Sequence, residues 1–488
     1  MVFKARNIDV IYLYCFYLGE RFANHREMLN FASKLFQQNF ASALIDLKEE
    51  LIASREEQYL PLIAEVDADL FYEEYIDSGR FIRLKLKPFI IENFRDDLLK
   101  RLTEKEKIEV ECYLFLHISG IALLTSRIKI RNKEIDFETL RKIISLDEEL
   151  FLAKIWRNII LDLKLEGERV EEKEYWHLLG DGQISYLTLD AILSFYDAYI
   201  RYHFFSFKKY KIKDMDKLDE MTKYIYNLTY PILIIRGTKG LPKKEYLKTY
   251  AVELYSLLMG EYDLKLIRNI IPNLEELILD YDLSYEDDKA LFIGWGNSLI
   301  IVTSFFENYL KTHSESFEED YMYYIWNDIA IFETLIFQNQ LLHLIDYQIN
   351  QLSTELSPSE LARIRDEIRL DLEEYYNVRV YAYGEYREYF EIGKEILGLK
   401  ELYATIKEKL ESIEYSINAK FQEKTSQYQT LLAILFGVFG AAQVAVQLYP
   451  SIELAAASIA AMLLASATLY LALREKAKLY KNTKHILW

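Results

Sequence analysis

Two long apolar stretches near the C-terminus constrain this chain more than any other feature. Residues 428–449 and residues 454–473 contain no charged side chain. Each stretch is about 20 residues long, and a helix of that length, at about 1.5 Å per residue, matches the ~30 Å hydrocarbon core of a bilayer. We therefore predict a two-helix transmembrane hairpin. A buried helical hairpin in a soluble core is the alternative.

The charges around these stretches predict how the hairpin is oriented. The turn between them carries only Glu453, whereas five basic residues follow the second stretch: Arg474, Lys476, Lys478, Lys481 and Lys484. Cytoplasmic flanks of membrane helices carry an excess of Lys and Arg. We expect a multi-pass protein of the cell membrane with both termini in the cytoplasm, because a hairpin places its two ends on the same side.

The first apolar stretch has one face that is more polar than the rest. Six small or amide-bearing residues fall within a sector of about 120° at 100° per residue: Gln429, Ala433, Gly437, Gly440, Gln443 and Gln447. Amides that face lipid lose their hydrogen-bond partners. One hypothesis is that this stripe lines a pore between several copies of the chain, since two helices cannot enclose a channel. The alternative is a close helix–helix contact at the two glycines, with the glutamines bonding between helices.

The remainder of the chain predicts an acidic soluble part. The formal net charge of the whole chain is −18, from 77 acidic and 59 basic residues, and it argues against a nucleic-acid partner. The two cysteines, Cys15 and Cys112, lie in apolar runs, so we expect buried free thiols and a reducing compartment. The expected domains are a cytoplasmic domain at 1–355, a helical stalk at 356–427, and the hairpin with its basic tail at 428–488.

The cytoplasmic domain is predicted to be α+β or α/β, predominantly helical. Two segments are typical of β-hairpins, residues 110–130 with a turn at Ser119–Gly120 and residues 290–304 with a turn near Gly296–Asn297. Further strands are expected at residues 10–18, 81–86 and 232–235. Helical periodicity marks residues 27–55, 214–227, 246–259 and 321–351.

The stalk is predicted from a helix start and an apolar seam. Ser357, Pro358 and Glu360 are typical of a helix N-terminus. Apolar residues then recur at three- and four-residue spacing: Leu399, Leu402, Ile406, Leu410, Ile413, Ile417 and Phe421. This spacing is typical of a coiled-coil seam of about three heptads. The seam predicts either packing within the chain or self-association.

This arrangement resembles the CorA-type two-helix membrane proteins. The resemblance is carried by the seam running directly into the first apolar stretch, by the hairpin, and by the basic tail at 474–488. It implies a homopentameric divalent-cation channel or transporter with a cytoplasmic α/β domain. Where that family has Gly-Met-Asn, this chain has Gln447-Leu448-Tyr449-Pro450, so the resemblance does not extend to magnesium selectivity. Divergent CorA-like proteins also occur as membrane effectors associated with CRISPR defence, which implies a nucleotide messenger as ligand.

No catalytic or cofactor motif stands out, so we expect no enzyme and no cofactor. The seven histidines are scattered, and no nucleophile elbow, Walker loop or dinucleotide fingerprint occurs. One segment has the pattern of an anion site, in which a strand, a basic glycine loop and a helix start present N–H groups and positive charge. Its candidate ligand-binding residues are Arg236, Gly237, Lys239, Gly240, Lys243 and Lys244. Solvated surface charge is the alternative.

Three clusters of acidic residues could bind a cation, but the sequence does not define a set of metal ligands. They lie at residues 147–149, at residues 286–288, and at Glu315, Glu318, Glu319 and Asp320. Between neighbouring subunits such groups can hold a divalent cation as a regulatory ion, and the same kind of ion is a candidate permeant ion. Ordinary solvated loops and helix caps are the alternative.

The sequence thus favours a CorA-like homo-oligomeric membrane channel or ion transporter gated from its cytoplasmic domain. The expected partners are the lipid bilayer, further copies of the chain, pentameric by resemblance, and a nucleotide or cation ligand. The alternative function is a membrane-anchored sensor or effector whose hairpin only tethers it.

Overall fold

A computed structural model describes most of the N-terminal domain and the long C-terminal helix. The described residues are 3–37, 41–45, 81–86, 89–92, 107–131, 134–144, 152–153, 189–209, 228–260, 263–314, 316–352, 356–372, 376, 384–448, 453, 456–457, 460–461 and 464. The chain divides into two compact units, Met1–Tyr347 with Asn377–Tyr403, and Gln348–Tyr376 with Ala404–Trp488. The described residues 384–403 belong to the first of these units.

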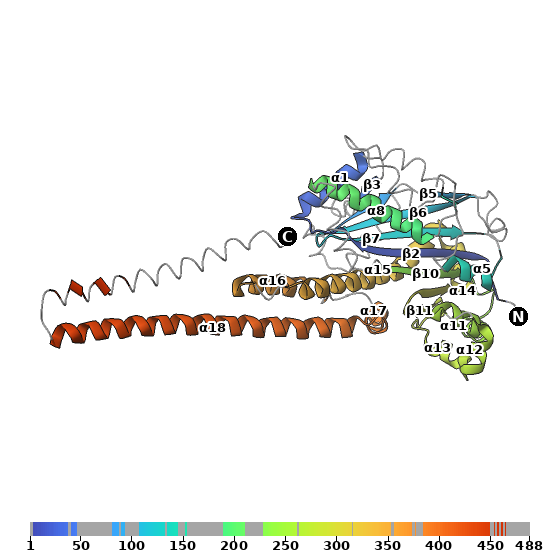
Figure 1. The fold of residues 1–488 in the computed structure, drawn as a ribbon. Coiled ribbons are helices and arrows are strands. Elements are labelled where there is room, and N and C mark those ends of the chain that lie inside the picture. The colour runs from blue at the N-terminus through green and yellow to red at the C-terminus, as the bar shows by residue number, and fades with distance from the viewer. Residues whose placement is uncertain are drawn as a thin grey trace. The chain divides into compact units, whose positions relative to one another are not determined.

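Strands of the first unit form one large sheet and one small pair. The strands of the large sheet are β2 (Asn7–Tyr17), β3 (Ala41–Ile45), β4 (Phe81–Leu86), β5 (Phe89–Glu92), β6 (Lys107–His117), β7 (Ile121–Ile130), β9 (Leu152–Ala153), β10 (Leu228–Arg236), β11 (Lys289–Ile293) and β12 (Ser298–Val302). Their order is β11-β12-β10-β2-β7-β6-β4-β3, with β5 pairing to β6 and β9 (Figure 1). β10 and β12 run parallel, whereas β2 is antiparallel to both of its neighbours. β1 (Lys4–Ala5) and β8 (Ile135–Asp136) form the separate pair.

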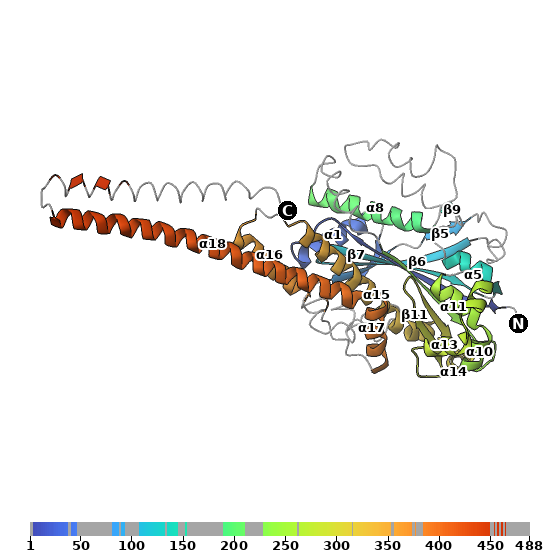
Figure 2. The ribbon, with the colours of Figure 1, turned by 60° about the horizontal axis from the view of Figure 1, so that its bottom comes forward.

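Alternate residues of β2 enter two different environments, as the period of two in a strand requires. Val10, Tyr12, Tyr14 and Phe16 belong to the main hydrophobic core. Helices α1 (His25–Gln37), α5 (Phe137–Ile144) and α8 (Leu189–Lys208) also contribute residues to that core, together with residues of the segment 246–278. Figure 2 shows α1 and α8 over one face of the sheet. Cover on both faces of the sheet is therefore needed to bury ten of the eleven residues of β2.

Helix α15 (Phe317–Asn350) covers the opposite face of the sheet. Trp326 packs against Tyr113 and Phe337 against Phe115, each pair with ring centroids 5.8 Å apart. All ten residues at positions 329–338 are buried, as expected for a helix that is apolar on all sides. Helix α17 (Gly384–Ile396) packs on α15 so closely that a Cβ at Gly393 would clash with the Leu335 side chain.

Five short helices follow β10 and β12: α10 (Lys243–Thr249), α11 (Ala251–Met259), α12 (Leu264–Ile270), α13 (Leu274–Asp280) and α14 (Ser304–His313). The prediction of one helix over residues 246–259 was wrong, because the chain breaks between α10 and α11 at Tyr250 (φ −115°, ψ 21°). The ring of Tyr250 stacks edge-on against Phe3 at 5.2 Å. This tertiary contact accompanies the interruption of the local helical pattern.

Both hairpins and the other expected strands are confirmed, but the helix expected at residues 27–55 is wrong beyond Gln37. Helix α1 ends there, and Ala41–Ile45 pairs with β4 as strand β3. Pairing to an available strand outweighs the helical periodicity, which is a weak preference over so short a segment. The remainder of that segment and the helix expected at 214–227 lie outside the described residues. Cys15 and Cys112 are buried free thiols, as predicted.

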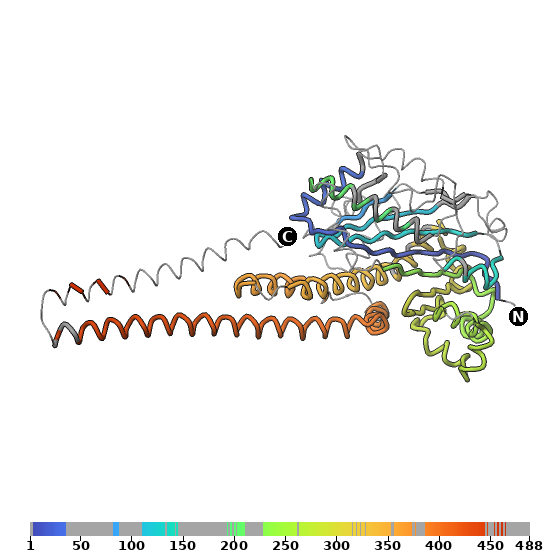
Figure 3. The backbone as a smooth tube through the Cα atoms, in the orientation of Figure 1, coloured from blue at the N-terminus to red at the C-terminus, as the bar shows by residue number. Residues whose placement is uncertain are grey.

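The described residues of the second unit are mainly helical. Helix α16 (Pro358–Asp371) begins with the predicted cap, in which the Ser357 hydroxyl accepts from the Glu360 N–H and the Glu360 carboxylate accepts from the Ser357 N–H. Helix α18 (Leu399–Leu448) is 50 residues long, and Figure 3 traces it as one uninterrupted helix. Its first residues belong to the first unit.

The seam of α18 packs partly within the chain. Ile406 and Ile417 are buried, and polar contacts with the segment before α16 flank them. The Lys409 ammonium donates to the Asn350 amide oxygen at 2.9 Å, and that of Lys420 donates to the Leu356 carbonyl at 2.8 Å. Internal packing thus accounts for this part of the predicted seam.

The second apolar stretch is described at only a few positions. Ala456, Ala457, Ala460, Ala461 and Leu464 are helical, and so is Glu453, which was expected in the turn before this stretch. The other residues of that stretch and the basic tail lie outside the described residues. The fold is therefore a mixed α+β sheet domain with a long C-terminal helix, and the hairpin stays a prediction.

Candidate functional site

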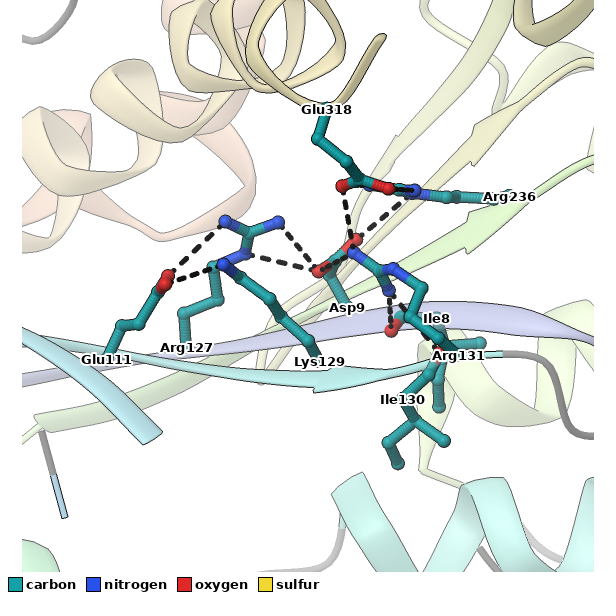
Figure 4. A network of polar contacts seen from close by, with 9 residues as sticks. All are labelled: Ile8, Asp9, Glu111, Arg127, Lys129, Ile130, Arg131, Arg236 and Glu318. Carbon is teal, nitrogen blue, oxygen red and sulfur yellow. Dashed lines mark hydrogen bonds and ion pairs between the residues drawn. The ribbon is translucent and has the colours of Figure 1, made fainter. Parts of the chain in front are cut away.

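A buried carboxylate with three arginines lies on the face of the sheet that α15 covers. Asp9 of β2 is fully buried, and its Oδ1 accepts from Arg127 Nη2 at 2.9 Å and Nε at 3.1 Å. Arg131 Nη2 donates to the same oxygen at 2.8 Å, and Arg236 Nε lies 3.4 Å from Oδ2 (Figure 4). One carboxylate thus holds three guanidinium groups.

The register of the sheet explains why these side chains meet. Lys129 of β7 lies directly opposite Asp9, so Arg127 and Arg131 occupy the diagonal positions on the same face. On the other side, Ile234 of β10 lies opposite Asp9, which places Arg236, two residues further along, on that face as well. The two neighbours of β2, β7 and β10, therefore bring the three arginines to Asp9.

Two further carboxylates lie around this centre. Glu318, in the first turn of α15, accepts from Arg236 with both oxygens at 2.7 and 2.8 Å, and lies 3.7 Å from Arg131. Glu111 of β6 accepts from Lys129 at 2.6 Å. Asp9, Glu111, Arg127, Lys129, Arg131, Arg236 and Glu318 form what we call the arginine cluster. With four cations against three carboxylates, it carries one excess positive charge.

The electrostatics of the arginine cluster keep its acids ionised. Burial raises the pKa of Asp9, but attraction by Arg127, Arg131 and Arg236 outweighs it, so the pKa lies below the ordinary value of 3.8. The hydrogen bonds from Arg236 lower the pKa of Glu318 as well. Arg236 also lies 3.5 Å from the ring centroid of Tyr321, which adds a cation–π contact.

Two other buried ion pairs join α15 to the sheet. Glu333 pairs with Arg83 of β4 and accepts from the Thr125 hydroxyl of β7 at 2.5 Å. Asp328 accepts from Lys289 of β11 at 2.9 Å, with both side chains almost fully buried. Breaking such a pair leaves an unpaired buried charge, which costs about 3–5 kcal/mol. These pairs fix the middle of α15, whereas Glu318 lies at its solvent-exposed start.

The six predicted anion-binding residues do lie in one strand, loop and helix start, but two of the cations are occupied within the fold. Arg236 belongs to the arginine cluster. Lys243 is buried, pairs with Asp282 at 3.0 Å and donates to the Ser284 carbonyl at 2.9 Å. Lys239 and Lys244 are exposed. Of the predicted anion-binding lysines, these two have side chains that a dissolved anion can reach.

The backbone of this loop is also engaged internally. The Gly237 N–H donates to the Val302 carbonyl at 2.8 Å, and the Gly240 N–H donates to the Ser304 hydroxyl at 3.0 Å. Lys239, at φ 54°, lies over the Tyr250 ring at 5.5 Å. The loop thus uses two of its N–H donors on its own fold instead of presenting them as a phosphate cradle.

The predicted stripe lies along α18 and is uncovered. Its six residues, Gln429, Ala433, Gly437, Gly440, Gln443 and Gln447, are all exposed. No described atom lies within 4 Å of a Cβ built at either glycine. By length and composition, one described helix, Leu399–Val444, is able to cross a membrane, and none of its apolar window is buried.

Metal ligands do not converge among the described residues, where no group of three or more His, Cys, Asp or Glu side chains is placed to hold an ion. Of the predicted acidic clusters, residues 147–149 and Glu315 lie outside that part of the chain. Asp288 accepts from the Tyr324 hydroxyl, and Asp320 accepts from the Ser314 hydroxyl. Glu318 belongs to the arginine cluster.

The sequence alone does not identify the arginine cluster as a site. A single charged residue, Asp9, within an otherwise apolar strand was the available signal, matched by Arg127 in β7. No protein-family model, no curated protein and no solved structure matches this chain.

Proposed function

We propose that this chain is a CorA-like, homo-oligomeric membrane channel or ion transporter whose cytoplasmic sheet domain controls the pore. The proposal rests first on α18. From Thr425 to Leu448 this helix has 24 residues without a charged side chain, which is about 36 Å of helix at about 1.5 Å per residue. That length spans a bilayer.

Exposure of this half of α18 carries the proposal. Leu432 is 50% exposed, Ile434 59% and Phe436 70%, so apolar side chains point outward from several sides of the helix. An apolar helix left uncovered in water forfeits the free energy of burial, about 25 cal/mol for each Å². Lipid and further copies of the chain supply the missing cover.

The stripe supports a pore in preference to a simple anchor. Its three amides are exposed along one face of the helix, where lipid would leave their hydrogen-bonding groups unpaired. Several copies with the stripe turned inward would hydrate these amides in a channel. The second apolar stretch completes the proposed hairpin, which makes the protein multi-pass with both termini in the cytoplasm. Five copies follow from the CorA resemblance.

Ion flux into liposomes tests the proposal. We expect the reconstituted full-length chain to conduct, and Gln443→Leu combined with Gln447→Leu to reduce the flux at least tenfold, because the pore loses its polar lining. Leu435→Met, on another face of α18, is the matched control and should conduct as the wild type does.

A different outcome would support the alternative function. If liposomes that contain correctly inserted protein stay ion-tight under all cation and nucleotide conditions, and the protein is a monomer in mild detergent, the hairpin only tethers a sensor or effector domain. Ring symmetry seen by electron microscopy would exclude that alternative.

A further inference from the structure

We propose that Arg131 and Arg236 form a binding site for a doubly charged oxyanion such as a phosphate group, and that the Glu318 carboxylate occupies this site in the structure. An oxyanion bound at this site would be a regulatory ligand of the sheet domain, and this regulatory role rests on the proposed function. Its binding chemistry does not.

Glu318 makes the contacts that a phosphate would make. Both of its oxygens accept from Arg236, through Nη1 at 2.7 Å and Nη2 at 2.8 Å, and one lies 3.7 Å from Arg131. Paired parallel bonds of this kind are how a guanidinium group recognises carboxylate and phosphate alike. An oxyanion can therefore replace the carboxylate without moving Arg236.

Glu318 can leave the arginine cluster, whereas Asp9 cannot. The Glu318 side chain is 55% exposed and lies in the first turn of α15. Asp9 is fully buried between two strands. Glu318 can therefore move further into water, whereas moving Asp9 would break its bonds to Arg127 and Arg131 inside the sheet.

The arginines are oriented for an anion before it arrives. The Arg236 side chain is 2% exposed, and its Nε, though close to Asp9, makes no hydrogen bond. Its guanidinium group lies against the Tyr321 ring. Arg131 is 24% exposed, is held by the Ile8 carbonyl at 2.7 Å, and gives the site an opening to solvent. Groups fixed in this way lose little entropy when a ligand binds.

The charge balance indicates two negative charges on the ligand. With Glu318 displaced, the four cations of the cluster face only Asp9 and Glu111, which leaves an excess of two positive charges. A phosphate dianion neutralises this excess, whereas Glu318 neutralises half of it. Exposed Lys239, three residues beyond Arg236, adds positive charge on the same loop.

Titration calorimetry with inorganic phosphate tests the site on the full-length chain in detergent. Glu318→Gln removes the competing charge, so we expect its Kd for phosphate to be at least fivefold lower than that of the wild type. Arg131→Gln should raise the Kd at least tenfold. The matched controls are Glu275→Gln and Arg268→Gln, both in exposed helices outside the arginine cluster, and both should leave the Kd unchanged.

Hydrogen exchange adds a readout that a purely structural role would not change. Phosphate should speed exchange in the first turn of α15 in the wild type, because Glu318 is released, and should have no such effect in Glu318→Gln. If folded Glu318→Gln binds phosphate no more tightly than the wild type, or if Arg131→Gln binds it equally well, the site does not exist. Because no flux is measured, failure here is separate from failure of the channel proposal.

Discussion

Asp9 is the buried residue on which the arginine cluster converges. Ten of the eleven residues of β2 are buried, and the apolar ones alone predict a strand correctly. A buried carboxylate is costly unless it is paired. Its partners, Arg127, Arg131 and Arg236, lie more than 110 residues away in the sequence and come together only through strand register. An aspartate in a buried strand indicates that a cationic partner exists, but it does not indicate which residues provide it.

His203 gives a pH-dependent stability that can be measured. Burial, followed by the nearby charge of Lys34, lowers its pKa from 6.5 to about 4. The unfolded chain therefore takes up a proton that the folded chain refuses between these two values. The free energy of unfolding is therefore unaffected by His203 above pH 6.5 and decreases as the pH falls towards 4. The total decrease is roughly 3 kcal/mol, at about 1.4 kcal/mol for each pH unit.

Thermal unfolding of the full-length chain in detergent at pH 7.5 and pH 4.5 checks this expectation. His203→Phe should lose much less stability between the two pH values than the wild type does. His313→Phe, at an exposed position of α14, is the matched control and should keep the wild-type pH dependence. Equal pH dependence in His203→Phe would show that the folded protein accepts the proton.

Secondary-structure elements were predicted best where turn chemistry and strand pattern agree. The hairpin of β6 and β7 turns at Ser119–Gly120, as expected, because Gly120 adopts φ +82°. Strand β3 and the break at Tyr250 were missed because sheet pairing and a packed aromatic ring determine them, and neither leaves a local pattern. The predicted anion loop has the expected secondary structure, yet burial of Arg236 and Lys243 depends on distant carboxylates.

Gly120 supports a specific prediction for the β6–β7 hairpin. A Cβ there would collide with the Glu20 carbonyl, which is backbone and cannot easily move. We expect Gly120→Ala to cost more than about 3 kcal/mol, since the left-handed conformation alone costs about 1–2 kcal/mol for a non-glycine residue. Gly260→Ala, at φ +69° with nothing within 4 Å, isolates the conformational cost. Equal losses in urea unfolding would show that the hairpin relaxes around the new methyl group.

For the whole molecule, α18 relates the sheet domain to the proposed membrane function. Its N-terminal part carries charges and buries Ile406 and Ile417, whereas its part beyond Lys424 is uncharged and uncovered. Under the proposed function, this one helix would pass from a protein-packed environment into lipid. Composition alone located the uncharged half of the helix, because charge content is a local property of the sequence, whereas its immersion in lipid stays a prediction.

The most direct test of the account is whether the uncharged half of α18 lies in a membrane. The expressed chain, after an alkaline wash of the membrane pellet, should stay in the pellet and be released only by detergent. Leu432→Lys combined with Phe436→Lys should reduce this retention, because each central lysine costs about 2.5–3.5 kcal/mol in a bilayer. Tyr415→Lys, before the uncharged half, should not. Wild-type protein that stays in the soluble fraction without detergent would contradict the account.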